Sequence, residues 1–129
     1  MARLLISAAH KSSGKTTIST GLCAALAARG RRVRPFKKGP DYIDPLWLGR
    51  AAGHPCVNLD FNTMSHAEIR EAVGRGLAEG EIALIEGNKG LYDGLDLEGS
   101  NSNAALARLV DAPVVLVIDS RGMTRGVAP

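Results

Sequence analysis

A Gly-Lys-Thr sequence at residues 14–16 constrains the fold more than any other feature, because of what lies on either side of it. Residues 3–8 are a short apolar run, typical of a buried strand. Apolar side chains then recur with the spacing of one helix face, at Ile18, Leu22, Ala25 and Leu26. The turn between them ends like the P-loop pattern G-x-x-x-x-G-K-[ST], with Ala9 in place of the first glycine. The sequence therefore predicts a strand, an anion-binding turn and a helix in succession.

The chemistry of this turn gives its polar side chains distinct roles. We expect Lys15 to reach the β and γ phosphates of a nucleotide, the Thr16 hydroxyl to bind Mg²⁺, and Thr17 to lie near the α phosphate. The residues expected to contact the nucleotide are Ser12, Ser13, Gly14, Lys15, Thr16 and Thr17. The alternative is a glycine-containing turn with a solvated lysine, but the flanking strand and helix favour the phosphate interpretation. ATP and Mg²⁺ are therefore the expected cofactors.

The rest of the chain alternates between strand and helix patterns. We expect strands at residues 33–37, 82–86 and 114–118, and helices at residues 65–79 and 104–110. A capping-box pattern begins the first of these helices, and its apolar face is Ile69, Val73 and Leu77. The intervening residues, 39–64, carry three prolines and are expected to form a long loop with a single helical turn at residues 46–52.

This order of elements predicts an α/β fold, a parallel sheet of P-loop NTPase type with helices on both faces. Ligands bind at the carboxyl ends of such strands. The unusual segments all follow predicted strands, at residues 9–15, 37–45, 86–99 and 119–126. Only four strands are visible, and the chain stops soon after the fourth. We therefore expect a truncated sheet, with residues 1–129 as the N-terminal part of an ATP-binding domain.

Composition argues against several classes of protein. Of 129 residues, 45% are hydrophobic and 22% charged, a balance typical of folded domains and unlike that of disordered chains. No apolar run approaches the roughly 18 residues of a membrane span. The net charge of +3 with only 4% aromatic residues favours anion binding over a nucleic-acid platform. Two cysteines are too few for a disulfide framework, so we expect reduced thiols and a cytoplasmic protein. The apolar runs, charge and aromatic content together predict no membrane partner and no nucleic-acid partner.

Charged residues follow the second and third predicted strands. The first loop holds two lysines and two aspartates, namely Lys37, Lys38, Asp41 and Asp44. Such a group suits an anionic substrate beside a metal ion, although a polar turn is the simpler alternative. Glu86 ends the next strand, where P-loop enzymes place a metal-binding acid, and Asp93 lies in the glycine-rich loop after it. We expect Glu86 and Thr16 to bind Mg²⁺.

Taken together, these motifs resemble the cobyrinic acid a,c-diamide synthase family, relatives of dethiobiotin synthetase. The motifs that carry the resemblance are Ser-Gly-Lys-Thr-Thr at 13–17, Lys-Gly-Pro-Asp-Tyr-Ile-Asp-Pro at 38–45, Asn-Leu-Asp at 58–60, Glu-Gly at 86–87, Gly-Leu-Tyr-Asp-Gly at 90–94 and Asp-Ser-Arg-Gly-Met at 119–123. The resemblance covers essentially the whole chain and implies a dethiobiotin synthetase-like domain. Two departures stand out: Leu48 replaces a histidine frequent in the family, and Asn88 and Lys89 replace two residues that are commonly apolar.

The resemblance implies ATP-dependent amidation of the a and c carboxylates of a tetrapyrrole, of the cobyrinate, hydrogenobyrinate, sirohydrochlorin or sirohaem type. ATP phosphorylates the carboxylate, and ammonia then displaces phosphate from the acyl phosphate. Such an enzyme is a carbon–nitrogen ligase of cobalamin biosynthesis or a related pathway. In the family, a C-terminal glutaminase domain supplies the ammonia, and we expect that domain to be absent from these 129 residues. Neither Cys23 nor Cys56 lies in a glutaminase-like setting.

This chemistry gives the charged residues further roles. Lys37 is expected to hold the nucleophilic carboxylate in line with the transferred phosphoryl group. Asp60 is expected to be a further Mg²⁺ ligand. The remaining acids are expected to bind a second Mg²⁺, orient the two lysines or hold ammonia and take its proton. The expected catalytic residues are Lys15, Lys37, Asp41, Asp44 and Asp93. The expected substrate contacts are Lys37, Lys38, Asp41, Tyr42, Asp44, Tyr92 and Asp93.

Two other functions remain open at this point. A dethiobiotin synthetase-like carboxylase would use the same scaffold without a glutaminase. A partitioning-type ATPase switch would predict a lysine at the position of His10 and a basic or amphipathic docking segment, and neither is evident. The sequence leaves open the macrocycle, its central metal, the nucleotide base and whether the protein is a homodimer.

Overall fold

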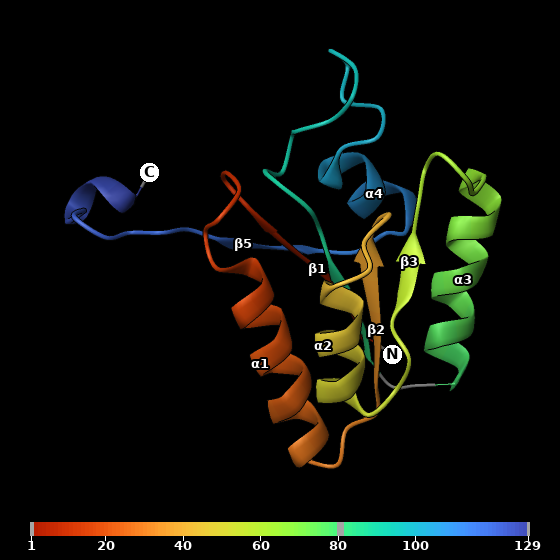
Figure 1. Ribbon diagram of the computed structural model, residues 1–129. Helices are drawn as coiled ribbons and strands as arrows, with labels where there is room; N and C mark the ends of the chain where they lie inside the picture. Colours follow the sequence, from red (N-terminus) through yellow and green to blue (C-terminus); the bar gives the residue numbers. More distant parts are fainter. Residues whose placement is uncertain (1, 80–81, 129) are drawn as a thin grey trace.

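The computed structural model describes residues 2–79 and 82–128, which form a five-stranded parallel sheet between two layers of helices (Figure 1). The strands are β1 (Ala2–Ala8), β2 (Val33–Lys38), β3 (Val57–Leu59), β4 (Ile82–Glu86) and β5 (Val114–Val117). The helices are α1 (Lys15–Ala28), α2 (Asp44–Ala52), α3 (His66–Glu79), α4 (Asn103–Leu109) and a short 3-10 helix, η1 (Arg125–Val127). The strand order is β3-β2-β4-β1-β5. The predicted parallel α/β fold with helices on both faces is confirmed.

The expectation of four strands is wrong, because β3 was missed. This strand has three residues and pairs with β2 at the edge of the sheet, so it is too short to show an apolar repeat. The helical turn predicted at residues 46–52 is confirmed but is longer than expected, since α2 extends over nine residues. Pro45 lies in the first turn of α2, where its missing N–H is not needed. The prolines of this segment therefore mark element boundaries.

Each face of the sheet has its own apolar core, because neighbouring strand residues point to opposite faces. One core, on the side of α1 and α2, contains Ile6, Cys23, Val33, Leu48, Ala52 and Leu84. The other core, on the side of α3 and α4, includes Leu5, Phe36, Leu59, Ile69, Val73, Ile85 and Leu106. Burial of each large apolar side chain contributes roughly 1.5–3 kcal/mol. The two cores together make the sheet a rigid platform for the loops at its carboxyl edge.

The apolar face predicted for α1 is wrong by one residue. Ile18 and Leu22 are 44% and 37% exposed, whereas Lys15, Ser19 and Cys23 are buried. These two stripes have the same spacing of four residues, so the repeat alone did not distinguish them. The stripe that packs inward has small side chains, Ser19 and Cys23, and it turns Lys15 toward the carboxyl edge of the sheet.

The predictions for α3 are confirmed. Ile69, Val73 and Leu77 are buried in the core. Ser65 and Glu68 form the predicted capping box: the Ser65 N–H donates to Glu68 Oε2 at 2.6 Å, and the Glu68 N–H donates to Ser65 Oγ at 3.2 Å. The capping-box pattern in the sequence therefore predicted the start of this helix correctly.

The loops expected to carry the site do meet at one edge of the sheet. The strands are all parallel, so the segments after β1, β2, β4 and β5 leave the sheet on the same side. In the register of β2 and β4, Lys37 lies opposite Glu86. The fold thereby places a lysine and a carboxylate side by side at the centre of this edge.

Candidate functional site

The turn after β1 has the backbone of an anion cradle. Ser12 and Gly14 have positive φ angles of 62° and 97°, which tighten the turn immediately before α1. The angle at Gly14 disfavours any residue with a β-carbon. The Ser13 hydroxyl donates to the His10 carbonyl at 2.8 Å and braces the turn. Thr17 is exposed beside the turn, as a phosphate contact requires.

Lys15 is a buried cation beside this cradle. Its side chain makes no ion pair within the described residues, and the residue is only 7% exposed. Burial lowers the pKa of Lys15, and the neighbouring Lys37 ammonium lowers this pKa further. A buried cation without a counterion favours binding of an anion, and a phosphate group in the cradle would supply one.

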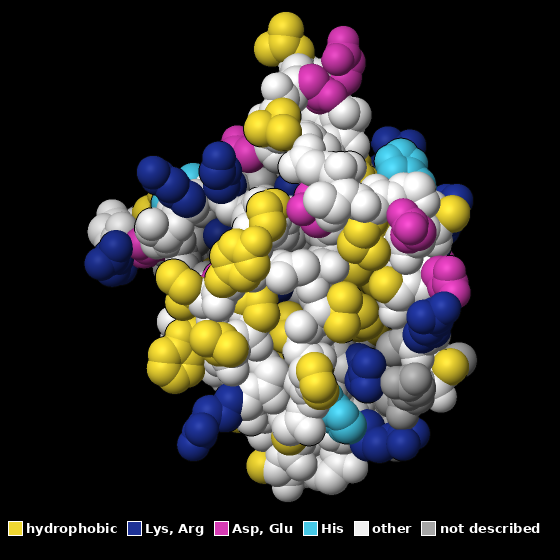
Figure 2. Space-filling view, turned by 45° about the vertical axis from the view of Figure 1, so that its right-hand side comes forward, with side chains coloured by type: hydrophobic (Ala, Val, Ile, Leu, Met, Phe, Trp, Pro, Cys, Tyr) yellow, Lys and Arg dark blue, Asp and Glu magenta, His cyan; other side chains and the backbone are white. Residues whose placement is uncertain are grey.

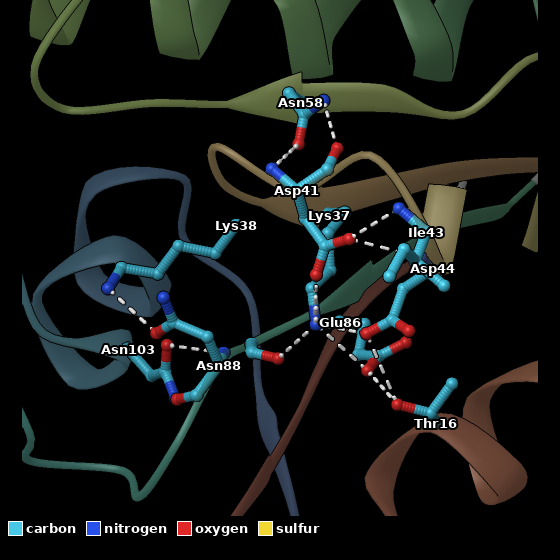
Figure 3. A network of polar contacts seen from close by, with 11 residues as sticks. Thr16, Lys37, Lys38, Asp41, Ile43, Asp44, Asn58, Glu86, Asn88 and Asn103 are labelled. Atoms are coloured by element: carbon cyan, nitrogen blue, oxygen red, sulfur yellow. Dashed lines mark hydrogen bonds and ion pairs between the residues drawn. The ribbon is translucent and has the colours of Figure 1, made fainter. Parts of the chain in front are cut away.

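Lys37 lies at the centre of a polar cluster built by four elements (Figure 3). Its Nζ atom lies 3.0 Å from Glu86 Oε1, 2.9 Å from Asp44 Oδ2 and 3.1 Å from the Gly87 carbonyl oxygen. The Thr16 hydroxyl contacts the same two carboxylates, at 2.8 Å from Glu86 Oε1 and 3.3 Å from Asp44 Oδ2. Strand β2, strand β4 and the first turns of α1 and α2 thus bring these side chains together.

The charged groups in this cluster change one another's pKa values. Burial alone would lower the pKa of Lys37, but the Glu86 and Asp44 carboxylates outweigh burial and raise it. Burial opposes ionisation of Asp44, yet its hydrogen bond and charge interaction with Lys37 lower its pKa. Glu86 is fully buried, and desolvation raises its pKa despite the contacts with Lys37 and Thr16. Lys37 therefore stays charged, while Glu86 depends on a nearby cation to remain ionised.

The donor atoms here fit a magnesium ion. The second carboxylate oxygen of Glu86, Oε2, is buried and has no hydrogen-bond partner among the described residues. Glu86, Thr16 and Asp44 offer only hard oxygen atoms, which Mg²⁺ prefers, and Mg²⁺ needs few protein ligands because it keeps several waters. The part of the chain that the structure describes contains no cluster of three or more His, Cys, Asp or Glu side chains that could enclose a metal. An ion held here would also need ligands from a nucleotide and water.

Asp41 shapes this site through the backbone. Its Oδ1 atom accepts the N–H groups of Ile43 and Asp44 at 2.8 and 3.0 Å, which holds the turn that leads into α2. Its own N–H donates to the Asn58 side chain at 3.2 Å, and Asn58 Nδ2 donates back to the Asp41 carbonyl at 2.9 Å. Asp41 Oδ2 lies 3.8 Å from Lys37 Nζ. These contacts agree with an orienting role for Asp41.

A second polar cluster surrounds Lys38. Its Nζ atom donates to Asn88 Oδ1 at 3.0 Å. The Asn88 backbone is in turn held by Asn103 of α4, whose Oδ1 accepts the Asn88 N–H at 3.2 Å and whose Nδ2 donates to the Asn88 carbonyl at 2.6 Å. Asn103 is fully buried and also donates to Ser7 Oγ of β1 at 3.0 Å. In Figure 3 this cluster lies on the opposite side of the β4 end from Asp44 and Thr16.

Two cavities lie at the carboxyl edge of the sheet. One, of about 430 Å³, is lined by Lys38, Asp60, Asn88, Lys89 and Asp93 among others. The other, of about 500 Å³, lies against the phosphate turn and the end of β5, where Ser13, Thr17, Asp119 and Arg121 line it. Four of the six predicted nucleotide residues border the second space, namely Ser12, Ser13, Gly14 and Thr17. Of the seven predicted substrate contacts, Lys38 and Asp93 border the first.

Some predicted residues lie apart from the cluster around Lys37. Asp60 borders the first cavity, where its Oδ1 accepts the Asn62 N–H at 2.9 Å, and no contact joins it to Thr16 or Glu86 among the described residues. Its role as a Mg²⁺ ligand stays a prediction. Tyr42 and Tyr92 are 84% and 78% exposed, so their rings are free to meet a large substrate. Exposed hydrophobic side chains gather on the face of the molecule shown in Figure 2. Asp93 closes a turn by accepting the Gly90 N–H at 2.8 Å.

The sequence did not single out four features of the site. Asp44 was expected on the acceptor side, but it also contacts Thr16, a partner 28 positions earlier in the chain. Asn88 was noted only as a departure from the family, and Asn103 was not noted at all. The sequence feature connected with Asn103 is the glycine at position 87. In the structure a β-carbon at Gly87 would lie 2.6 Å from the Asn103 side chain, so this position requires glycine. Asp119 and Arg121, which pair with each other beside the phosphate turn, were noted only as a family motif.

Comparison with known proteins places the chain in a family. The family described as "CobQ/CobB/MinD/ParA nucleotide binding domain" matches residues 5–121. The chain belongs to this family. The cobyrinate a,c-diamide synthase of Magnetococcus marinus is 55% identical over 127 residues, which cover 98% of this chain and 27% of that protein. The cobyrinate a,c-diamide synthase of Methanosarcina barkeri is 45% identical over 130 residues, 98% of this chain and 26% of that protein.

These relatives confirm the resemblance to the cobyrinic acid a,c-diamide synthase family. The chain spans about a quarter of the length of the curated relatives it matches. Among solved structures, the cell division protein FtsY of Thermotoga maritima aligns with a TM-score of 0.69 at 20% identity, over 98% of this chain and 46% of that one. The signal recognition particle 54 kDa protein of Aeropyrum pernix aligns with a TM-score of 0.63 at 22% identity, over 89% of this chain and 28% of that one. At this identity the two structures show a shared P-loop fold alone.

Proposed function

We propose that this chain is the ATP-binding part of a ligase that amidates the a and c carboxylates of a tetrapyrrole. The observation that supports this most is the placement of Lys37: it is bound by Glu86 and Asp44, and Thr16 of the phosphate turn contacts the same two carboxylates. An enzyme that joins a phosphoryl donor to an anionic acceptor needs such a cation between them. The names of the curated relatives support cobyrinate as the acceptor.

The reaction has two balanced steps. An oxygen of the acceptor carboxylate attacks the γ phosphorus of ATP, the bond to the β-phosphate oxygen breaks, and ADP leaves. Ammonia then attacks the acyl carbon, the carbon–oxygen bond to phosphate breaks, and an amide and inorganic phosphate form once ammonia has lost its proton. Activation is needed because oxide is a poor leaving group and phosphate is a good one.

The residues of the chain divide this work between them. Lys15 and the backbone of the phosphate turn hold the transferred phosphoryl group, and Lys37 holds the carboxylate in line with it. Thr16, Glu86 and Asp44 would hold Mg²⁺, which neutralises charge on the phosphates when bound. Asp93 borders the acceptor cavity and takes the proton that ammonia loses. The exposed rings of Tyr42 and Tyr92 provide apolar faces for the macrocycle.

Ammonia would come from a glutaminase domain elsewhere in the protein, because the thiols of this chain are poor nucleophiles. Burial raises the pKa of Cys23 to about 11 and that of Cys56 to about 12. No helix among the described residues is both long and apolar enough to cross a membrane. We propose a cytoplasmic protein that acts without nucleic acid, with homodimerisation as an open alternative.

The test is amidation of cobyrinate by the full-length protein with ATP, Mg²⁺ and ammonium chloride. The expected product gains two amide groups, with ATP hydrolysed to ADP in proportion. The Lys15→Ala variant should lose this activity about 100-fold or more and keep its circular dichroism spectrum, since the Lys15 side chain forms no ion pair with the residues that the structure describes. Carboxylation of an amine in place of amidation would instead favour the dethiobiotin synthetase-like alternative. Near-normal turnover by the variant would remove the phosphate-turn assignment.

A further inference from the structure

Lys37 and Lys38 are adjacent buried lysines with opposite electrostatic surroundings. As neighbours on β2, they point to opposite faces of the sheet. Lys37 meets three carboxylates within 4 Å. Lys38 is 8% exposed and forms no ion pair with any residue that the structure describes. A charge buried without a counterion costs several kcal/mol unless a ligand provides one.

The side chain of Lys38 is nevertheless held in one position. Asn88 Oδ1 accepts its hydrogen bond, and an amide oxygen orients an ammonium group without neutralising it. Asn88 is fixed in turn by the buried amide of Asn103, which ties together β1, α4 and the loop after β4. Strands β1 and β2, helix α4 and the loop after β4 thus hold the Lys38 ammonium group in place without a counterion.

The presented cation faces a cavity that can hold a ligand. Lys38 and Asn88 line the space of about 430 Å³, and Lys89 adds a second positive charge there. Two acids also line it, but both are engaged with backbone N–H groups: Asp60 with Asn62 and Asp93 with Gly90. Burial and the charges of Lys89 and Lys37 lower the pKa of Lys38, and only Asp60 opposes them. Lys38 thus has no carboxylate at ion-pair distance among the described residues, and an anion bound in this cavity would supply its counterion.

We propose that Lys38, held by Asn88 and Asn103, binds a carboxylate of the acceptor that is not itself amidated. This inference rests on the proposed function, because it assumes a polycarboxylate acceptor. Lys37, on the other face of β2, meets the carboxylate that reacts with ATP. The Gly87 carbonyl contacts Lys37 and the next residue, Asn88, contacts Lys38, so the loop after β4 separates the two carboxylate sites. A second anchored carboxylate fixes which edge of the macrocycle faces the phosphate turn, and Asn88 and Asn103 act as positioning residues.

The test measures binding of cobyrinate, and separately of its a,c-diamide product, to the full-length protein without ATP, by the change in visible absorption. The Lys38→Gln variant should bind both compounds about tenfold more weakly than the wild type. Asn88→Asp should weaken binding of both as much, because the new carboxylate would neutralise Lys38 while leaving it in place. Asn88→Ala should weaken both about threefold, since the cation is kept but no longer held.

A matched control removes one positive charge elsewhere. Arg29 is exposed at the end of α1, away from the carboxyl edge, so Arg29→Gln should change both affinities less than twofold. ATP affinity should be unchanged in all four variants. If Lys38→Gln and Asn88→Asp behave like Arg29→Gln, the carboxylate site is wrong although the proposed function stands. If they weaken binding of cobyrinate but not of the diamide, Lys38 contacts the reacting carboxylate and the inference is also wrong. If the wild type binds neither compound, the proposed function and this inference fail together.

Discussion

Replacing Lys37 by methionine tests whether this lysine neutralises the buried carboxylates of Glu86 and Asp44. The change keeps the length of the side chain and removes the charge that lies 3.0 Å from Glu86 and 2.9 Å from Asp44. At an effective dielectric constant near 20, each contact of this length is worth about 5 kcal/mol before desolvation. Removing one partner of a buried ion pair typically costs about 3–5 kcal/mol. We expect a loss of this size in the free energy of unfolding, measured by urea denaturation at pH 8.

The loss should depend on pH in a defined direction. Lys37 lowers the pKa of Glu86, so without Lys37 this pKa rises further above its ordinary value of 4.5. A carboxyl whose pKa is raised by folding contributes stability at low pH and loses it as the pH rises through the folded value. The difference between wild type and Lys37→Met should therefore be smaller at pH 5 than at pH 8. Mg²⁺ at ten times its dissociation constant from the variant should stabilise the variant by about 1.4 kcal/mol and the wild type by less.

The adjacent lysine provides the matched control. Lys38→Met removes the same charge one residue away, where no carboxylate of the described residues is paired with it, and should leave the free energy of unfolding unchanged or raise it, because an uncompensated buried charge costs stability. A loss below about 1 kcal/mol for Lys37→Met would contradict our account of this cluster. So would equal losses for the two variants, or a difference from wild type that does not change with pH.

Three further predictions concern single contacts. Glu86→Gln should raise the Mg²⁺ concentration needed for half-maximal turnover at least tenfold while changing nucleotide affinity less than threefold, because a metal ligand acts mainly in the transition state; an unaltered Mg²⁺ titration would make Glu86 structural. Asp93→Asn should leave ATP affinity within twofold and let a trappable acyl phosphate accumulate; a parallel loss of ATP affinity and activity would assign Asp93 to the nucleotide site. Ser65→Ala should lower the free energy of unfolding by about 1 kcal/mol in urea, because α3 loses its cap; an unchanged midpoint would show that the capping box adds nothing.

Features set by neighbouring residues could be predicted from the sequence. The phosphate turn, the capping box at Ser65 and the apolar face of α3 each depend on side chains within a few positions of one another. The parallel sheet followed from the alternation of elements, and with it the edge where ligands bind. Features set by distant residues could not be predicted. Asp44 meets Thr16 across 28 positions, and Asn103 meets Ser7 across 96.

The predictions for the buried face of α1 and for strand β3 failed for different reasons. Two stripes of α1 share the same period, and their order of burial depends on how closely the helix approaches the sheet. The inward stripe has Ser19 and Cys23, which are smaller than Ile18 and Leu22. Hydrophobicity therefore pointed to the wrong stripe. For β3, three residues are stabilised by pairing with β2, which no local pattern reveals.

Lys15 and Lys38 together give a last prediction, because both are buried cations without an ion pair in the described residues. Burial lowers the pKa of each below its ordinary value of 10.5. A base whose pKa is lowered by folding reduces stability at neutral pH, and an anion bound beside it reverses the loss. In our proposal Lys15 binds the nucleotide and Lys38 binds the acceptor. A non-hydrolysable ATP analogue and cobyrinate should therefore raise the melting temperature of the full-length protein additively. Lys15→Ala should abolish only the shift caused by the nucleotide analogue, whereas Lys38→Gln should reduce only the shift caused by cobyrinate. If either variant loses both shifts, one lysine serves both ligands, and the division of the carboxyl edge into a nucleotide side and an acceptor side is wrong.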